Sequence, residues 1–285
     1  MSEHKPPIGL VALDLDGTLL NSHGCITEGS KEAIRKAAAA GVHIAIATGR
    51  PFSQLPLAQL ADLPIEYAMT ANGASAYRIR DRRCLFETDL PDETVRDILG
   101  EVLQHEVHIT CFIHGSGVTP DKCRDYTERL IVPPNIKVDY YTTRKYVPDL
   151  RAYILENQFH VEKFTLNFIR TPEGELVDRD YLEKWLKARA DIDVVCGGYS
   201  NLEITKKGID KGVGLYALAD CLGFAHEATM AIGDAGNDLA ILRAAGIGVC
   251  MANGDAECLA AADYITASNE AEGVARAFRR FLPIT

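Results

Sequence analysis

The feature of this sequence that most constrains its fold is an apolar run that ends in two carboxylates. Residues 8–13 are almost all apolar, and the run is short enough to be a strand buried on both faces of a parallel sheet. Asp14 and Asp16 follow it, and Gly17 ends the strand. Open α/β sheets bind ligands beyond the carboxyl ends of their strands. The run therefore predicts an α/β protein with a ligand site at Asp14.

The spacing of the two aspartates indicates a metal ion. Residues two apart on an extended strand point to the same face, and like charges about 4 Å apart repel by roughly 4 kcal/mol at an effective dielectric near 20. A cation removes this repulsion, and hard carboxylate oxygens favour Mg²⁺. The alternative is a pair of solvated aspartates, Asp14 and Asp16, in a strand-to-helix turn.

A second strand is expected to end beside the first. Residues 31–40 have helix-forming composition, and residues 42–47 form another short apolar run. Strand, helix and strand in this order make a βαβ unit, so Thr48 would stand at the same sheet edge as Asp14. The Thr48 hydroxyl can bind an anion, and Gly49 lets backbone N–H groups approach one closely. An ordinary turn is the alternative.

A third apolar run, residues 229–233, also ends in polar side chains. Asp234 follows it directly, and Asn237 and Asp238 stand at the expected start of a helix over 239–245. Asp238 is four residues beyond Asp234, so it can lie one turn behind it. The alternative is an N-cap with first-turn acids, which accounts for Asn237 or Asp238 but not for Asp234. A further helix is expected over residues 213–222, and a lysine at or near its start could also reach the site.

The middle of the chain is expected to be a self-contained insert, because residues 89–196 have their own amphipathic elements but no further acidic or glycine-rich anion loop. The two core segments are then 1–88 and 197–285, and the chain returns to a strand at 199–205. The basic residues of the insert, Arg124 and Lys163 among them, are expected to be solvated. The sequence predicts helices over 92–104, 121–130, 147–157 and 175–190, and strands over 107–114, 136–142, 162–169 and 193–196.

Composition excludes several classes of protein. A formal net charge of −10 argues against nucleic acid as an obligate partner. Walker-A and Gly-x-Gly-x-x-Gly patterns are absent, which disfavours P-loop chemistry and dinucleotide binding. The eight cysteines have no Cys-x-x-Cys spacing, so buried reduced thiols are expected. The start of the chain has no apolar signal core and no stretch could span a membrane, so we expect a cytoplasmic protein without a membrane partner.

Four short motifs carry a resemblance to a known family. In chain order they begin at Asp14 (Asp-Leu-Asp-Gly-Thr-Leu), Thr48 (Thr-Gly-Arg-Pro), Gly208 (Gly-Ile-Asp-Lys-Gly) and Gly233 (Gly-Asp-Ala-Gly-Asn-Asp). Together they resemble the ordered motifs of the haloacid dehalogenase superfamily. Residues 72–74, 201–205 and 251–253 resemble more narrowly its Cof-type phosphatases. The resemblance implies a Rossmann-like parallel-sheet core, 1–88 and 197–285, with an inserted α/β cap, 89–196, that sets substrate specificity.

The resemblance also implies a role for each motif residue. Asp14 would be the nucleophile and a metal ligand, and Asp16 the general acid/base that holds Mg²⁺ through its backbone carbonyl. Asp234 would be the third protein ligand to the metal, and Asp238 would orient the motif lysine or a metal-bound water. The residues that would bind the phosphoryl group are Thr48, Gly49, Lys211 and Asn237. The motif selects Lys211 over Lys206 and Lys207.

The function expected from these observations is that of a Mg²⁺-dependent phosphatase. Its substrate would be a small phosphorylated metabolite, with a sugar phosphate as first choice, and the reaction would pass through an aspartyl-phosphate. Asp16 argues against halide chemistry, because the superfamily's dehalogenases lack an acid there. Two alternatives remain at this point, a phosphosugar mutase and a regulator that binds a phosphorylated ligand without turnover. The sequence leaves the oligomeric state open.

Overall fold

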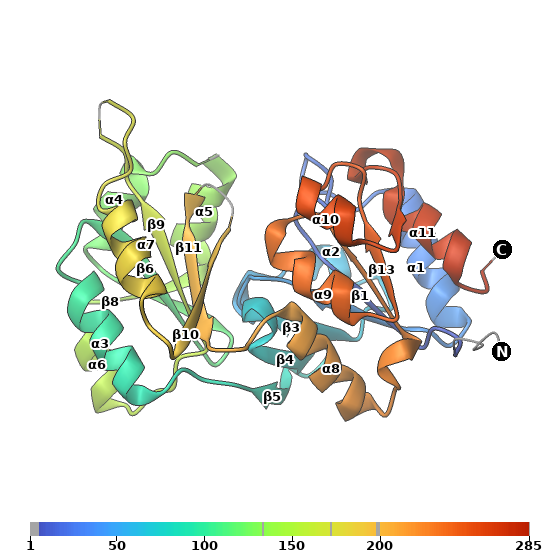
Figure 1. The fold of residues 1–285 in the computed structure, drawn as a ribbon, viewed down its shortest axis with the longest axis horizontal. Coiled ribbons are helices and arrows are strands. Elements are labelled where there is room, and N and C mark those ends of the chain that lie inside the picture. The colour runs from blue at the N-terminus through green and yellow to red at the C-terminus, as the bar shows by residue number, and fades with distance from the viewer. Residues whose placement is uncertain (1–5, 133, 172, 198–199, 285) are drawn as a thin grey trace. The chain divides into compact units, whose positions relative to one another are not determined.

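The computed structural model describes residues 6–132, 134–171, 173–197 and 200–284. Contacts between Cα atoms divide the chain into two compact units, and each consists of separate segments of sequence (Figure 1). The first unit contains Met1–Gly49, Pro56–Phe86 and Asp210–Thr285, and the second contains Arg50–Leu55 and Glu87–Ile209.

The first unit is built on an eight-stranded sheet in the order β14-β13-β12-β1-β2-β3-β4-β5. Strand β1 lies inside this sheet and pairs in parallel with β2 on one side and β12 on the other. All residues of β1 are buried, which confirms the prediction from the apolar run. The strands are β1 (Leu10–Leu13), β2 (His43–Ala47), β3 (Tyr67–Thr70), β4 (Ser75–Arg78), β5 (Arg83–Glu87), β12 (Thr229–Gly233), β13 (Ile247–Cys250) and β14 (Tyr264–Ile265).

Helices flank this sheet and complete its core. Thr27 caps the first of them by accepting a hydrogen bond from the Ser30 amide. Leu215 and Leu218 of α8 pack in one apolar cluster with Leu10 and Ala12 of β1. The helices are α1 (Glu28–Ala39), α2 (Leu57–Leu60), α8 (Lys211–Leu222), α9 (Leu239–Ala244), α10 (Ala256–Ala261) and α11 (Gly273–Phe281).

The second unit has its own six-stranded sheet in the order β10-β11-β9-β6-β7-β8. Its apolar core is separate, as expected for an insert, and contains Ile109, Phe164 and Ile204. The strands are β6 (Val107–Ile113), β7 (Ser116–Pro120), β8 (Arg144–Val147), β9 (Lys163–Phe168), β10 (Ile192–Cys196) and β11 (Leu202–Lys206). The helices are α3 (Asp92–Val102), α4 (Cys123–Arg129), α5 (Pro134–Thr143), α6 (Leu150–Glu156) and α7 (Arg179–Lys187).

The structural division differs from the predicted boundaries at two places. Residues 50–55 group with the second unit, and so does the segment that ends at Ile209. The reason at the second place is strand pairing, because β11 pairs antiparallel with both β9 and β10 of the second sheet. The strand expected at 199–205 is thus an element of the insert, and its first residue, Tyr199, lies outside the described residues.

The prediction of a strand at 136–142 is wrong, because this segment is helix α5. The helix places Tyr140 in a buried cluster with Leu130 and Ile169, so tertiary packing overrides the alternating pattern. The sequence also predicts a helix over residues 54–63, and the helix in the structure is shorter, Leu57–Leu60. A 3₁₀ turn, Phe52–Gln54, precedes the short helix α2, and Pro56 separates the two.

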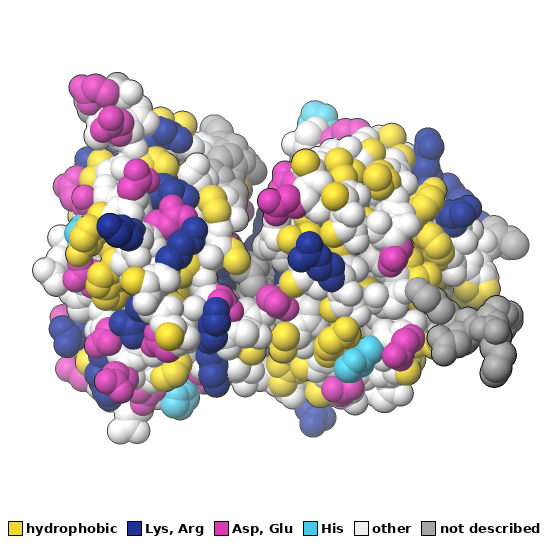
Figure 2. All heavy atoms as spheres, viewed as in Figure 1, with side chains coloured by type: hydrophobic (Ala, Val, Ile, Leu, Met, Phe, Trp, Pro, Cys, Tyr) yellow, Lys and Arg dark blue, Asp and Glu magenta, His cyan; other side chains and the backbone are white. Residues whose placement is uncertain are grey.

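The surface and the cysteines agree with most of the composition argument. Side chains of both charge signs are interspersed on the described surface in Figure 2. Four of the eight cysteines, Cys25, Cys84, Cys196 and Cys221, are exposed, contrary to a uniformly buried set. A search of the described helices finds none that is long and apolar enough to cross a membrane.

Candidate active site

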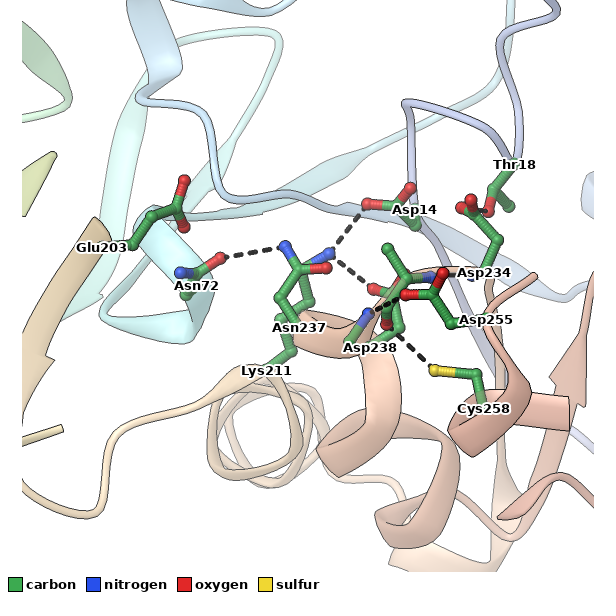
Figure 3. A network of polar contacts seen from close by, with 12 residues as sticks. Asp14, Thr18, Asn72, Glu203, Lys211, Asp234, Asn237, Asp238, Asp255 and Cys258 are labelled. Carbon is green, nitrogen blue, oxygen red and sulfur yellow. Dashed lines mark hydrogen bonds and ion pairs between the residues drawn. The ribbon is translucent and has the colours of Figure 1, made fainter. Parts of the chain in front are cut away.

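The carboxylates expected at neighbouring strand ends meet in the first unit. Asp14 and Asp234 directly follow β1 and β12, which pair in parallel with Leu13 opposite Ile232. The Asp14 amide continues this pairing by donating to the Ile232 carbonyl at 2.9 Å. Carboxylate oxygens of Asp14, Asp234 and Asp238 all lie within 4.8 Å of one another (Figure 3). Strand order alone therefore assembles an acidic cluster at one edge of the sheet.

Lys211 is the lysine that reaches this cluster. It is the first residue of α8, whose N-cap Asp210 accepts a hydrogen bond from the Val213 amide. The Lys211 Nζ donates to Asp14 Oδ1 at 2.8 Å and to Asp238 Oδ1 at 2.6 Å. Burial lowers the pKa of Lys211, but the two carboxylates outweigh it and raise the pKa above its ordinary value. Lys211 is thus a buried ammonium.

Asp238 is held by donors on both carboxylate oxygens. Its Oδ1 accepts from Lys211, and its Oδ2 accepts from the backbone amides of Asp234 and Ala235 at 3.0 and 3.1 Å. The close approach needs Gly233, because a Cβ there would lie 2.5 Å from the Asp238 Cγ. With both oxygens engaged, Asp238 fixes Lys211 and the loop that follows β12.

The other two carboxylates of the cluster fit a divalent cation. Burial, and then the charge of Asp238, raise the pKa of Asp14 well above its ordinary value, against the opposing effect of Lys211. Burial raises the pKa of Asp234 to about 6, although Thr18 Oγ1 donates to its Oδ1 at 2.7 Å. Two buried carboxylates that resist ionisation gain from a bound cation, and their hard oxygens suit Mg²⁺. The residues present therefore fit a divalent metal ion.

Glycine at position 17 permits the approach of the first loop to Asp234. Gly17 has φ +85°, a left-handed conformation, and a Cβ there would lie 2.3 Å from Asp234 Oδ2. The Gly17 carbonyl also accepts a hydrogen bond from Asn253 Nδ2 at 2.9 Å. The loop after β1 is thus tied to the loop after β13.

Asp16 lies at the exposed side of this loop. Its side chain is exposed, and its negative charge is one of the causes that raise the pKa of Asp14. Asp16 is thus an exposed carboxylate near enough to Asp14 to act on it electrostatically.

Two of the predicted phosphate-binding residues, Thr48 and Asn237, follow β2 and β12, the strands that pair with β1 on either side. Thr48 is buried directly after β2, and its amide donates to the Met69 carbonyl at 3.0 Å. Gly49 follows it in the first unit. Asn237 Nδ2 donates to Asn72 Oδ1 at 3.4 Å, and Asn72 has a left-handed φ of 58°. Asn72 is therefore a further polar neighbour of the site.

Two further residues support the site, and the reasoning from the motifs assigned neither of them a role. Thr18 donates to Asp234, and its signal was its place beside Gly17 in the first motif. Asp255 Oδ2 accepts from the Gly236 amide at 3.1 Å, and the Asp255 amide donates to the Asp234 carbonyl at 2.8 Å. No sequence pattern marked Asp255, because its contacts depend on the spatial order of β12 and β13.

Comparison with known proteins identifies the family. The profile of haloacid dehalogenase-like hydrolases matches residues 11–278. The chain belongs to this family. The resemblance expressed by the four motifs is thus confirmed, and the Cof-type group is consistent with it.

Among the curated relatives of this haloacid dehalogenase-like hydrolase is YitU of Bacillus subtilis strain 168. It is named a 5-amino-6-(5-phospho-D-ribitylamino)uracil phosphatase, and it is 31% identical over 279 residues that cover 96% of this chain and 98% of YitU. Another is the chloroplastic endoribonuclease YBEY of Arabidopsis thaliana, 28% identical over 289 residues. That match covers 98% of this chain, but the chain spans only 47% of the length of YBEY.

A solved structure of a haloacid dehalogenase-like hydrolase from B. subtilis shares the fold. It has a TM-score of 0.82 and 25% sequence identity, with 96% of this chain and 100% of that chain covered. The mixed α/β architecture predicted from the sequence is confirmed by this similarity. In the present hydrolase, every residue of the acidic cluster and its lysine belongs to the first unit.

Proposed function

We propose that this hydrolase is a Mg²⁺-dependent phosphatase that cleaves a small phosphorylated metabolite through an aspartyl-phosphate on Asp14. The observation that carries the proposal is the position of the Asp14 carboxylate, 2.8 Å from the Lys211 ammonium and beside two further aspartates. A nearby ammonium, together with a metal ion held by a pair of carboxylates, would stabilise the negative charge of a phosphoryl group. The phosphatase names of the curated relatives support the same reaction.

Asp14 would act as the nucleophile in the first step. Its carboxylate oxygen forms a bond to phosphorus, and the bond from phosphorus to the substrate oxygen breaks with its electron pair on that oxygen. Asp16 supplies the proton that turns the leaving oxygen into an alcohol. The exposure of Asp16 suits this role, because it must regain its starting protonation state in every turnover.

Water would complete the reaction in the second step. The Asp16 carboxylate takes a proton from a water molecule, whose oxygen bonds to phosphorus as the bond to Asp14 breaks. Inorganic phosphate leaves, and Asp14 is again a free carboxylate. Transfer to water is what separates this hydrolysis from a mutase, in which a second sugar hydroxyl takes the phosphoryl group.

The remaining site residues would bind and neutralise the phosphoryl group. Lys211, Thr48 and Asn237 donate hydrogen bonds to its oxygens, and backbone N–H groups beside Gly49 add to these. Asp14, Asp234 and the Asp16 carbonyl would hold the Mg²⁺ ion, which supplies charge neutralisation at the phosphoryl oxygens. Asp238 keeps Lys211 in place.

We further propose a sugar or sugar-alcohol phosphate as the substrate, selected by the second unit acting as a cap. The support for this class is the printed name of YitU, which places a phosphorylated ribityl group on that relative's substrate. A cap with its own sheet and core can change its binding residues without disturbing the acidic cluster, which lies wholly in the first unit.

The deciding experiment is release of inorganic phosphate from a panel of phosphorylated metabolites, with Mg²⁺ or with EDTA. We expect Mg²⁺-dependent release that Asp14→Asn abolishes. The matched control is Asp62→Asn, the same chemical change at an exposed aspartate, which should leave the rate unchanged. Near-normal turnover by folded Asp14→Asn protein would overturn the covalent mechanism. No release from any compound would overturn the phosphatase assignment.

A further inference from the structure

The sheet of the second unit has an apolar face and a polar face. On β6 and β9, alternate residues pack in the apolar core, and the residues between them are polar except for Phe112. His108 stands directly opposite Asn167 in the register of these strands, and Thr110 stands opposite Thr165. All four side chains are buried. A buried polar face must have its hydrogen bonds supplied from elsewhere.

Arg144 of β8 reaches this polar face across β7. Its register partner on β7 is Gly117, and a Cβ on Gly117 would lie 3.3 Å from the Arg144 Cγ and 3.2 Å from the Thr110 Cγ2. The missing side chain thus gives the Arg144 stem a path over β7 toward β6. Its guanidinium Nη1 lies 3.5 Å from His108 Nε2, within hydrogen-bond distance.

Helix α5 covers the same group of side chains with an aromatic ring. The Arg144 Cζ lies 3.5 Å from the centroid of the Tyr140 ring. The Tyr140 hydroxyl donates to Asn167 Oδ1 at 3.0 Å, which leaves the Asn167 Nδ2 group as the free end of that amide. We refer to His108, Tyr140, Arg144, Thr165 and Asn167 together as the Arg144 cluster.

Among the described residues, no carboxylate forms an ion pair with Arg144, and its ring contact is with Tyr140. Arginine has only donors, so the His108 Nε2 that faces it is the acceptor. The ring is neutral, since burial and the charge of Arg144 lower the pKa of His108. Its hydrogen therefore sits on Nδ1.

Four buried polar atoms of the Arg144 cluster have no hydrogen-bond partner among the described residues. They are His108 Nδ1, Arg144 Nε, Thr165 Oγ1 and Asn167 Nδ2. Three of the four are N–H donors, and the fourth is a hydroxyl that can also donate. Each such atom left unmatched destabilises the folded protein. A surplus of donors around an unpaired cation calls for a negatively charged acceptor.

We infer that the Arg144 cluster is a binding site for an oxyanion, a carboxylate or phosphate group of a ligand. The planar guanidinium is suited to bind either group through two parallel hydrogen bonds. The donors of His108, Asn167 and Thr165 satisfy the remaining oxygen lone pairs. Arg144 is the partly exposed member of the cluster. The site lies wholly in the second unit, and the inference does not depend on the proposed phosphatase activity.

The test is a titration of the full-length, ¹⁵N-histidine-labelled protein followed by NMR at the His108 ring. Inorganic phosphate and malonate are the two probes, and they distinguish a phosphate site from a carboxylate site. The experiment is read at His108 because phosphate can also bind to the first unit. We expect a saturable shift of the Nδ1 resonance with at least one probe.

Two arginine variants make a matched pair for this titration. Arg144→Met keeps an unbranched apolar stem and removes the charged guanidinium, and it should weaken anion binding by about tenfold or more, the effect of losing a charge-assisted hydrogen bond. Arg124→Met removes an arginine that also stacks on a tyrosine, with its Cζ 3.8 Å from the Tyr146 ring centroid. Arg124→Met should leave the anion response unchanged.

Asn167→Asp is the second arm, and it preserves the shape of the side chain. Its carboxylate can still accept from Tyr140, and it supplies Arg144 with a counter-ion from the chain itself. We expect the variant to fold and to lose the response to both anions. The inference is overturned if neither anion shifts the His108 resonance, since water then satisfies these atoms, or if Asn167→Asp or Arg144→Met responds as the wild type does.

Discussion

The Lys211 ammonium and the Asp238 carboxylate form an ion pair in which neither side chain is exposed, with Nζ 2.6 Å from Oδ1. Removing one partner of such a pair leaves a buried charge without compensation. We expect Asp238→Asn to lower the free energy of unfolding by about 3 kcal/mol, and to reduce turnover because Lys211 loses its position. Denaturant unfolding and phosphate release check both expectations.

The control for this prediction is a second lysine–aspartate pair in the same chain. Lys207 and Asp193 form an ion pair whose side chains are 62% and 35% exposed. Asp193→Asn should cost about 1 kcal/mol or less, as for other exposed pairs. Equal losses of unfolding free energy in the two variants would contradict the prediction that the buried pair contributes more to stability.

Substitution of two glycines in the loop after β1 distinguishes the effect of backbone strain from that of a steric clash. Gly17→Ala and Gly24→Ala both place a side chain at positive φ, but only Gly17 would direct its Cβ into Asp234; nothing lies within 4 Å of Gly24. We expect Gly24→Ala to cost about 1 kcal/mol, the scale of left-handed strain. Gly17→Ala should cost more and should also weaken Mg²⁺ binding, measured by calorimetry. Similar Mg²⁺ affinity in the two variants would contradict the prediction that a side chain at position 17 displaces Asp234.

Asp234 should destabilise the metal-free protein near neutral pH. Its pKa of about 6 is above the ordinary value of 3.8, so the folded state binds more protons than the unfolded state between these values. Stability from this group therefore rises as pH falls from about 6 to about 4. Asp234→Asn should be more stable than the wild type by about 1–2 kcal/mol at pH 7 in EDTA.

The same comparison at lower pH is the internal check. Near pH 3, below both pKa values, the wild-type Asp234 is protonated in both states, so the advantage of Asp234→Asn should have disappeared. With saturating Mg²⁺ at pH 7, the order should reverse, because only the wild type gains from the ion. An advantage that does not change with pH would show that burial of the charge is not its cause.

Asp191 in the second unit should show the opposite dependence on pH. Hydrogen bonds from Arg189, and from Thr94, lower its pKa from 3.8 to about 2. The stability that it contributes is then fully present above pH 4 and is lost as pH falls toward 2. Asp191→Asn should cost about 1 kcal/mol at pH 7, and the difference from wild type should shrink steadily as pH falls from 4 toward 2. A constant difference would rule out ionisation as its source.

Asp16→Asn tests the general acid/base without disturbing the core. Because Asp16 is exposed, the variant should unfold at nearly the wild-type temperature. Turnover should fall by roughly 10²–10⁴, the range for a general acid–base group. Substrates with a good leaving group should be affected less in the first step, because they need no protonation. An unchanged rate with a poor leaving group would remove Asp16 from the mechanism.

The residues of the acidic cluster could be predicted because each follows an apolar strand. An unbroken apolar run such as Leu10–Leu13 predicts a buried strand. Parallel pairing then brings Asp14 and Asp234 to one edge of the sheet, independently of where the helices pack. The motif then selected Lys211, which the spacing of lysines alone left open. The position of Asp255 depends on strand order, for which the sequence has no local signal.

The second unit was predicted less well, for a physical reason. Residues 136–142 alternate between apolar and polar like a strand, yet they form α5. The helix packs Tyr140 against Ile169 in a buried cluster. Lys163 was expected in solvent, but its side chain is fully buried and donates to Glu203 at 2.6 Å. Both outcomes depend on partners far along the chain, which local patterns do not contain.

The first unit can complete its fold only when the last part of the chain has been synthesised. Lys211 follows Asp14 by 197 positions, so a ribosome has made β1 and β2 long before α8 and β12 exist. Until then one edge of β1, an apolar strand, has no partner and is open to pairing with another chain. A nascent chain of this protein therefore depends on protection of that edge, and a product that stops before Thr229 can neither close the sheet nor assemble the acidic cluster.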